Sequence, residues 1–157
     1  MKERISVVVG LVMLVVVAAC GGGGGPTSPS SASIAAVEHG SFELVNEERQ
    51  VSGVSPVLGN DPELAAIARA FSEQMRDEGF FSHTSPSGVT LGQRLAARGY
   101  QFSFAGENLA RVSNSGNPAS FAHQLLMKNP NHRDNILNSQ YVHTGRHPQT
   151  HSLVFCF

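Results

Sequence analysis

The chain has 157 residues, which allows one domain or two at most. Hydrophobic residues make up 41% of it and charged residues 15%, and this apolar content excludes a wholly disordered chain. The formal net charge is −1 and no run of basic residues occurs, which argues against nucleic-acid binding by charge. Two cysteines are too few for a disulfide-dense mini-protein.

The first 19 residues have the features of an export signal. Lys2 and Arg4 precede an uncharged stretch from Ile5 to Ala19 that is rich in valine and leucine. A bilayer-spanning helix needs about 20 apolar residues, so this stretch is short for a permanent anchor and suits a signal peptide. It ends in small residues directly before Cys20. This resembles a bacterial lipoprotein signal, in which the cysteine is acylated and the chain is cut before it. The alternative is an ordinary signal peptide with an incidental cysteine.

The segment after this cysteine predicts a flexible tether. Residues 20–33 are rich in glycine, serine and proline and offer nothing that could form a core. We therefore expect a signal peptide (1–19), a lipidated Cys20 followed by a linker (20–33), and a folded domain (34–157). The protein is then extracytoplasmic and held on a membrane by its lipid. Because Gly21 rather than aspartate follows the cysteine, we expect the outer membrane if the source has two membranes.

The domain begins with two predicted helices. Apolar residues between positions 34 and 51 recur at roughly helical spacing, and Gly53 is expected to end this helix. The second helix is clearer, because Asn60-Asp61-Pro62-Glu63 combines a capping side chain with proline in the first turn. It continues to Gly79, with apolar residues at three- and four-residue steps. The residues expected in the core from this face are Leu64, Ile67, Ala68, Phe71 and Met75.

Two shorter helices and two strands complete the predicted elements. A helix is expected from Thr90 to Gly99, burying Leu91 and Leu95, and another over residues 117–128. The side chains expected to be buried from the latter are Phe121, Leu125 and Leu126. Residues 101–104 alternate polar and apolar, which predicts a strand, and residues 153–157 predict a last, interior strand. Helices around a small sheet make the fold class α+β.

Five sequence blocks resemble a known family. They occur in the order Asn46-Glu47-Glu48-Arg49, Asp61-Pro62-Glu63-Leu64-Ala65, Gly79-Phe80-Phe81-Ser82-His83-Thr84-Ser85-Pro86, Gly106-Glu107-Asn108 and His132-Arg133-Asp134-Asn135-Ile136-Leu137-Asn138. This set is similar to the bacterial branch of the CAP superfamily (cysteine-rich secretory proteins, antigen 5, pathogenesis-related 1), also called SCP-like domains. The resemblance covers residues 42 to about 145. It implies an α-β-α sandwich, with a small antiparallel sheet of three or four strands between helical layers.

The resemblance also implies a central cleft in which histidines and acidic residues face each other, sometimes around a divalent metal. By position, His83 and His132 match the two cleft histidines and Glu107 the first cleft acid. Asn129 stands where bacterial relatives usually have serine, and the family's second glutamate has no counterpart in residues 126–129. Two histidines and a carboxylate suit Zn²⁺ or another divalent metal, with one coordination position open. The alternative is that Glu107 and His132 form a hydrogen-bonded scaffold.

Other polar residues are expected to have structural roles. Asn108 and Asn135 are expected to close turns or bond backbone groups, and Arg49 and Arg133 to form buried ion pairs. We expect His123 to lie at the surface or in the core rather than to bind a ligand. None of these residues then contributes to the chemistry of the cleft.

The C-terminus departs from the family pattern. Relatives usually continue after Thr144-Gly145 with a full strand, a turn and a last strand. Here residues 146–151 are expected to connect directly to the last strand, and Pro148 cannot donate to a ladder, so we expect a shortened or bulged hairpin. Cys156 is expected to be a buried free thiol if Cys20 is acylated, with an intermolecular disulfide as the alternative.

Two functions from different classes follow from these expectations. The first is a lipid-anchored binding module whose His/Glu cleft takes a divalent metal or a small hydrophobic or cell-envelope ligand. The second is a metal-dependent hydrolase, of a peptidase kind, that uses His83, Glu107 and His132. A purely structural envelope protein is a third possibility. We favour binding, because no nucleophile motif such as G-x-S-x-G occurs, and we assign no catalytic residue.

Overall fold

The structure is a computed structural model and describes residues 31–110, 117–149 and 152–156. Five helices and four strands lie in these ranges. The helices are α1 (Ser31–Val51), α2 (Pro62–Glu78), α3 (Leu91–Ala97), α4 (Pro118–Lys128) and α5 (Pro130–Ile136). The strands are β1 (Gly59–Asn60), β2 (Glu107–Ala110), β3 (His143–Gln149) and β4 (Ser152–Cys156). The export signal, Cys20 and most of the expected linker lie outside the described residues.

The four helices expected from the sequence are present, and their ends follow the expected signals. Asp61 caps α2 by accepting hydrogen bonds from the backbone N–H groups of Glu63 and Leu64, and Gly79 ends α2 in the left-handed conformation. Thr90 begins α3 as part of a capping box. The apolar face of α2 is buried as predicted, from Leu64 to Met75. Helix α5 was not expected, because the residues between its first, Pro130, and its last, Ile136, are all polar.

The sheet is mixed rather than wholly antiparallel. Its strand order is β1-β3-β4-β2, with β4 antiparallel to both β3 and β2 and the two-residue β1 parallel to β3. The last strand is therefore interior, as expected. The C-terminal hairpin differs from the expectation, because residues 146–149 extend β3 instead of forming the connection, and Pro148 pairs with Leu153. The side chain of Cys156 lies outside the described part of the structure.

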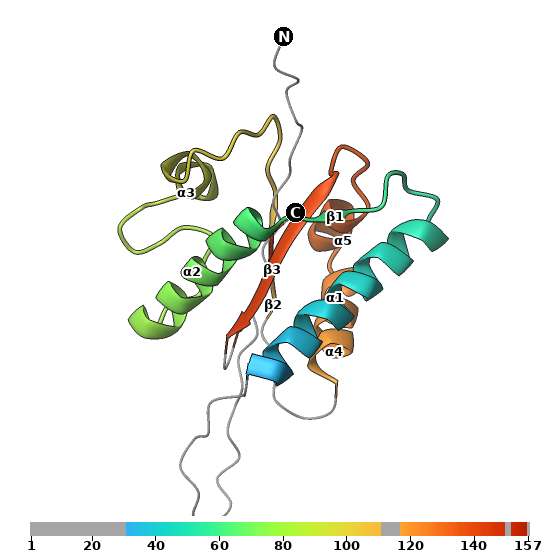
Figure 1. Cartoon of the computed structure of the whole chain (residues 1–157), viewed down its shortest axis with the longest axis horizontal. Helices are drawn as coiled ribbons and strands as arrows, with labels where there is room; N and C mark the ends of the chain where they lie inside the picture. The colour runs from blue at the N-terminus through green and yellow to red at the C-terminus, as the bar shows by residue number, and fades with distance from the viewer. Residues whose placement is uncertain (1–30, 111–116, 150–151, 157) are drawn as a thin grey trace, which may run out of the picture.

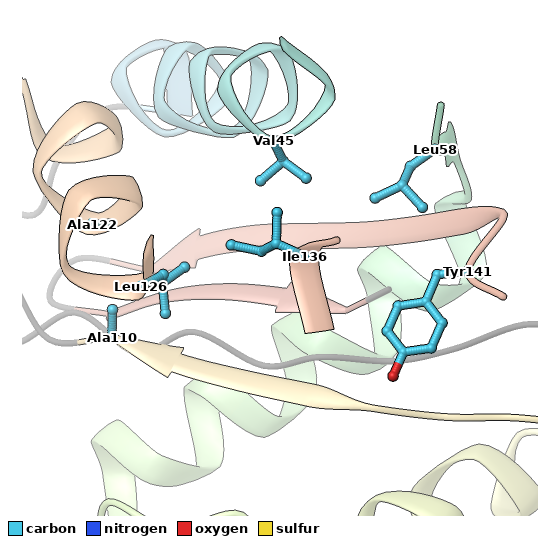
Figure 2. Packing of buried hydrophobic residues seen from close by; sticks show 7 residues of the cluster. All are labelled: Val45, Leu58, Ala110, Ala122, Leu126, Ile136 and Tyr141. Atoms are coloured by element: carbon cyan, nitrogen blue, oxygen red, sulfur yellow. The ribbon is translucent and has the colours of Figure 1, made fainter. Parts of the chain in front are cut away.

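Helical layers cover the two faces of this sheet. Figure 1 shows α2 and α3 on one side of the strands and α1, α4 and α5 on the other. Each side has its own core: one cluster is centred on α2 and α3 and includes Phe71 and Leu95, and the other joins α1, α4 and α5. In the second cluster, Val45, Leu126 and Ile136 converge over the sheet (Figure 2). The expected α-β-α sandwich is confirmed.

Two predictions of local structure were wrong. Residues 101–104 form no strand, and Phe102 and Phe104 are exposed. In α4, Leu126 is buried as expected, whereas Phe121 and Leu125 point to solvent and the small Ala119 and Ala122 face the core. The reason is close helix packing: a Cβ added at Gly40 of α1 would lie only 3.5 Å from the Cβ of Ala119. Two helices this close leave no space for large side chains between them.

Arg49 is fully buried as expected, although backbone carbonyls surround it in place of the expected acidic partner. Its guanidinium donates to the carbonyls of Pro56, Ile136, Asn138 and Tyr141, at 2.7–3.2 Å. Burial lowers the pKa of Arg49 below its usual value. Arg49 thus connects α1 to three later segments: the loop at Pro56, the end of α5 and the residues that lead to β3. These bonds anchor the α1 side of the fold.

The exposure of Arg133 and His123 tests the structural roles that the sequence predicted for them. Arg133 is exposed on α5, so the prediction of a buried ion pair for it was wrong. His123 is buried on α4, with its Nε2 atom 3.6 Å from a carboxylate oxygen of Glu48 on α1. Burial lowers the pKa of His123, with Glu48 acting in the opposite direction. In the described part of the chain, none of the helices has the length and apolarity that crossing a membrane requires.

Candidate functional site

The site is organised by the edge strand β2, whose residues alternate between the two faces of the sheet. Leu109 belongs to the core on the α2 and α3 side, and Ala110 to the core on the α1, α4 and α5 side. By this alternation, Glu107 faces the same side as Leu109, and Asn108 the same side as Ala110. The first residue of β2 therefore places its carboxylate beside the segment that joins α2 to α3.

Glu107 makes two side-chain contacts there, one through each carboxylate oxygen. The Nδ1 atom of His83 lies 2.7 Å from Oε1, and the Nη2 group of Arg94 donates to Oε2. The Glu107 side chain is 5% exposed, Arg94 is 11% exposed and His83 is 53% exposed. The carboxylate is thus buried behind a histidine that reaches the surface, and both of its oxygens have partners.

The sequence reasoning missed Arg94, which holds this arrangement together from α3. Its Nη1 group donates to the carbonyl oxygen of His83 at 3.1 Å, and its Cζ atom lies 3.4 Å from the centre of the Phe71 ring. The sequence holds a signal for the position of Arg94 on α3, although none for its pairing with Glu107. Arg94 follows the partly buried Leu91 by three residues, so the two side chains lie on the same face of α3.

His132 is the third expected site residue, and it belongs to the other helical layer. It lies half-buried on α5, where its carbonyl oxygen accepts a hydrogen bond from Asn108 Nδ2 at 2.9 Å. Asn108 in turn accepts from Asn135 Nδ2 at 2.8 Å. The prediction of a bond to a backbone group is confirmed for Asn108, whereas the Asn135 side chain bonds the side chains of Asn108 and Tyr141. Burial lowers the pKa of His132, and the charge of His83 adds to this effect, so the two histidines are electrostatically coupled.

Two opposing influences act on the pKa of the Glu107 carboxyl group. Burial raises the pKa of its carboxyl group above the ordinary value, because the charged form is separated from water. The hydrogen bond with His83 and the positive charge of Arg94 lower that pKa and so favour the carboxylate. The partners that favour the charged form of Glu107 are therefore side chains of the same chain.

The three expected ligands do not fit a metal in this geometry. Glu107 gives one oxygen to Arg94 and the other to His83, so a metal at this carboxylate would compete with the positive guanidinium for it. The Nδ1 atom of His83 is used in the same contact. Among the residues that the structure describes, no group of three or more His, Cys, Asp or Glu side chains is placed to hold a metal ion. The zinc site stays a prediction, and we derive no chemistry through it.

Exposed aromatic side chains occur on the two segments that carry His83 and lead to Glu107. Phe81 precedes His83 by two residues, and Phe102 and Phe104 lie on the loop that leads to Glu107. Phe102 is next to α3, because a Cβ added at Gly92 would lie 3.8 Å from its Cζ atom. The candidate site thus combines a half-exposed histidine with three partly exposed phenylalanines, which we call the aromatic rim (Phe81, Phe102 and Phe104).

Comparisons with known proteins give a consistent result. The YkwD protein of Bacillus subtilis (strain 168), which is uncharacterized, is 34% identical over 119 residues, covering 76% of this chain and 45% of that protein. The crystal structure of an extracellular SCP-domain protein from Bacillus anthracis has a TM-score of 0.71 and 28% identity, covering 83% of this chain and 44% of that one. An outer surface protein of Borrelia burgdorferi shares the fold, with a TM-score of 0.61, 20% identity and coverage of 83% and 94%.

A second relative, the B. subtilis membrane protein YlbC, is 34% identical and is covered over 29% of its length. The chain therefore spans less than half the length of each of these two curated relatives. The YlbC match includes 104 residues, or 66% of this chain. The sequence model of the cysteine-rich secretory protein (CAP) family matches residues 42–148, which include every site residue described above except the membrane-anchor candidate Cys20. With the sandwich fold and the SCP-domain neighbour, this match shows that the chain belongs to the CAP family.

Proposed function

We propose that this CAP domain is a lipid-anchored, extracytoplasmic binding module for a small hydrophobic or cell-envelope ligand. The observation that carries the proposal is the pairing of Glu107 with both Arg94 and His83. A carboxylate used in this way supports the architecture of the site and is not available as a general base. The aromatic rim beside it offers apolar contact area to a ligand.

Metal-dependent hydrolysis is the competing function. It requires a metal or a carboxylate that can act on water, and an open position next to it. Glu107 would have to leave its partners before it could serve, and an uncompensated Arg94 would then remain in a site with little solvent. Binding requires no such rearrangement, and for this reason we prefer it.

Extraction of the ligand tests the proposal. The protein is recovered from membranes of producing cells and its bound small molecules are identified by mass spectrometry. We expect Phe104→Ser to reduce the recovered ligand by about tenfold, because the ring contributes apolar contact area at the site. Phe121→Ser is the matched control: Phe121 is 49% exposed and Phe104 48%, but Phe121 lies on α4 in the other helical layer. Equal recovery from both variants, or peptide turnover by the wild type that a chelator abolishes, would contradict the proposal.

Names of similar proteins support the extracytoplasmic location. The B. anthracis neighbour is described as extracellular and the Borrelia neighbour as an outer surface protein, and YlbC is named as a membrane protein. For this chain, we propose that the lipid is attached at Cys20, in the sequence context described above. A peripheral anchor of this kind holds the domain at the membrane surface.

Replacement of Cys20 tests the anchor. Cys20→Ser is expected to abolish incorporation of labelled palmitate and to move the protein from the membrane fraction to the soluble fraction, because the acylated thiol is lost. Cys156→Ser is the matched control and should leave both labelling and fractionation unchanged. Palmitate labelling that persists in Cys20→Ser would show that the lipid is attached elsewhere.

A further inference from the structure

Arg94 makes an unusually complete set of contacts for a residue outside the expected site. Its Nη2 group donates to the Glu107 carboxylate, its Nη1 group donates to the His83 carbonyl, and the guanidinium carbon lies over the Phe71 ring. The side chain is 11% exposed. These contacts fix Arg94 in three directions, and each partner belongs to a different part of the fold: β2, the segment between α2 and α3, and α2 itself.

Such an arginine competes with any external cation for Glu107. A divalent ion that approached the carboxylate would meet the positive guanidinium within hydrogen-bonding distance of the same group, and like charges at this range repel strongly when poorly solvated. Displacing Arg94 would leave a buried guanidinium without its counter-ion, which is costly. The second carboxylate oxygen already contacts His83 Nδ1 at 2.7 Å, so an ion at that oxygen would have to share it with the histidine.

We propose that Arg94 is a positioning residue that acts as the built-in cation of the site: it satisfies Glu107, holds the His83 segment through its carbonyl and keeps divalent metals away from the carboxylate. In this account, the residue at position 94 decides whether Glu107 and His83 can bind a metal. This inference goes beyond the proposed binding function, and it concerns which cation pairs with Glu107 rather than which ligand the aromatic rim contacts.

A double-mutant cycle with Zn²⁺ alone as the probe tests this inference. The four proteins are the wild type, Arg94→Met, Glu107→Gln and the combined variant, each as the full chain in detergent, with zinc affinity measured by calorimetric titration. Methionine keeps apolar contact with Phe71 and removes the charge. We expect Arg94→Met to bind Zn²⁺ at least about tenfold more tightly than the wild type, and this gain to disappear in the combined variant. Zinc bound by histidines elsewhere contributes equally to all four proteins and cancels in the cycle.

Two results would overturn the inference. One is an Arg94→Met protein that is folded, by its cooperative thermal transition, and binds Zn²⁺ no more tightly than the wild type. The other is a wild type that already binds zinc through Glu107, so that Glu107→Gln alone weakens binding about tenfold. If Arg94→Met does not fold, this second comparison still decides: equal zinc affinity of the wild type and Glu107→Gln supports the inference. Ligand recovery from the wild type is a separate measurement, so either idea can fail without the other.

Discussion

Replacing Arg49 with methionine is expected to destabilise the domain by about 4 kcal/mol or more. The guanidinium donates to four carbonyl groups on three segments, and the side chain is fully buried. Methionine fills similar space but donates nothing, so the carbonyls of Pro56, Ile136 and Tyr141 lose the Arg49 donor. The carbonyl of Asn138 keeps only the longer hydrogen bond from the backbone N–H of Tyr141, at 3.3 Å. Each buried acceptor left without a partner costs about 1–3 kcal/mol. The total approaches the whole stability of a typical domain, about 5–15 kcal/mol.

Urea unfolding measures this loss. Arg49→Lys should fall between the wild type and Arg49→Met, because a lysine ammonium has three donors and lacks the planar fork of arginine. Arg133→Met is the matched control: Arg133 is exposed on α5, so this variant should stay within about 0.5 kcal/mol of the wild type. If Arg49→Met were as stable as Arg133→Met, the carbonyl cluster would not be the anchor that we describe.

The second large effect is expected at Gly145 on β3. A Cβ added there would overlap backbone atoms of Leu64 and Ala65 in the first turn of α2. Backbone cannot rotate away as a flexible side chain can, so α2 would have to move off the sheet and open the core that it covers. Overpacking of a well-filled site typically costs about 1–3 kcal/mol, and a clash with helix backbone should exceed this range. We expect Gly145→Ala to unfold the domain or to lower its melting temperature by about 10 °C or more.

A second glycine provides the control for this prediction. Gly40 lies inside α1, and a Cβ there would meet only the Cβ of Ala119, at an ordinary contact distance of 3.5 Å. Gly40→Ala should therefore stabilise the domain by up to about 1 kcal/mol through its higher helix propensity. Thermal unfolding of both variants gives opposite signs if the packing is as described. A stable Gly145→Ala protein would mean that α2 and β3 are further apart.

The elements that the sequence predicted well are those with strong local signals. Helix α2 was expected with its cap, its end and its buried face, because Asp61, Pro62 and Gly79 act locally and the apolar period is regular. The errors arose where tertiary packing decides. Ala119 and Ala122 face the core because α1 approaches closely, and a hydrophobic pattern that favours the largest side chains assigns that face to Phe121 and Leu125 instead.

The candidate site was predicted in part. Family resemblance identified His83 and Glu107, which the structure brings into contact. Arg94 was missed because its pairing with Glu107 joins α3 to an edge strand thirteen residues later, and no local pattern encodes that contact. The sequence predicted a strand at residues 101–104, where phenylalanines alternate with polar residues, and none at β2, which begins with two polar residues.

One measurement tests the central claim, that the charge of Glu107 is satisfied within the chain and the site binds ligands without a metal. Crystals of the protein are grown with Zn²⁺, and anomalous scattering at the zinc edge locates every bound ion. We predict that Arg94 and His83 both contact the Glu107 carboxylate and that no anomalous peak lies within coordination distance of it, about 2.0–2.2 Å. A peak on Glu107, with Arg94 displaced from the carboxylate, would contradict this account and favour the metal-dependent function.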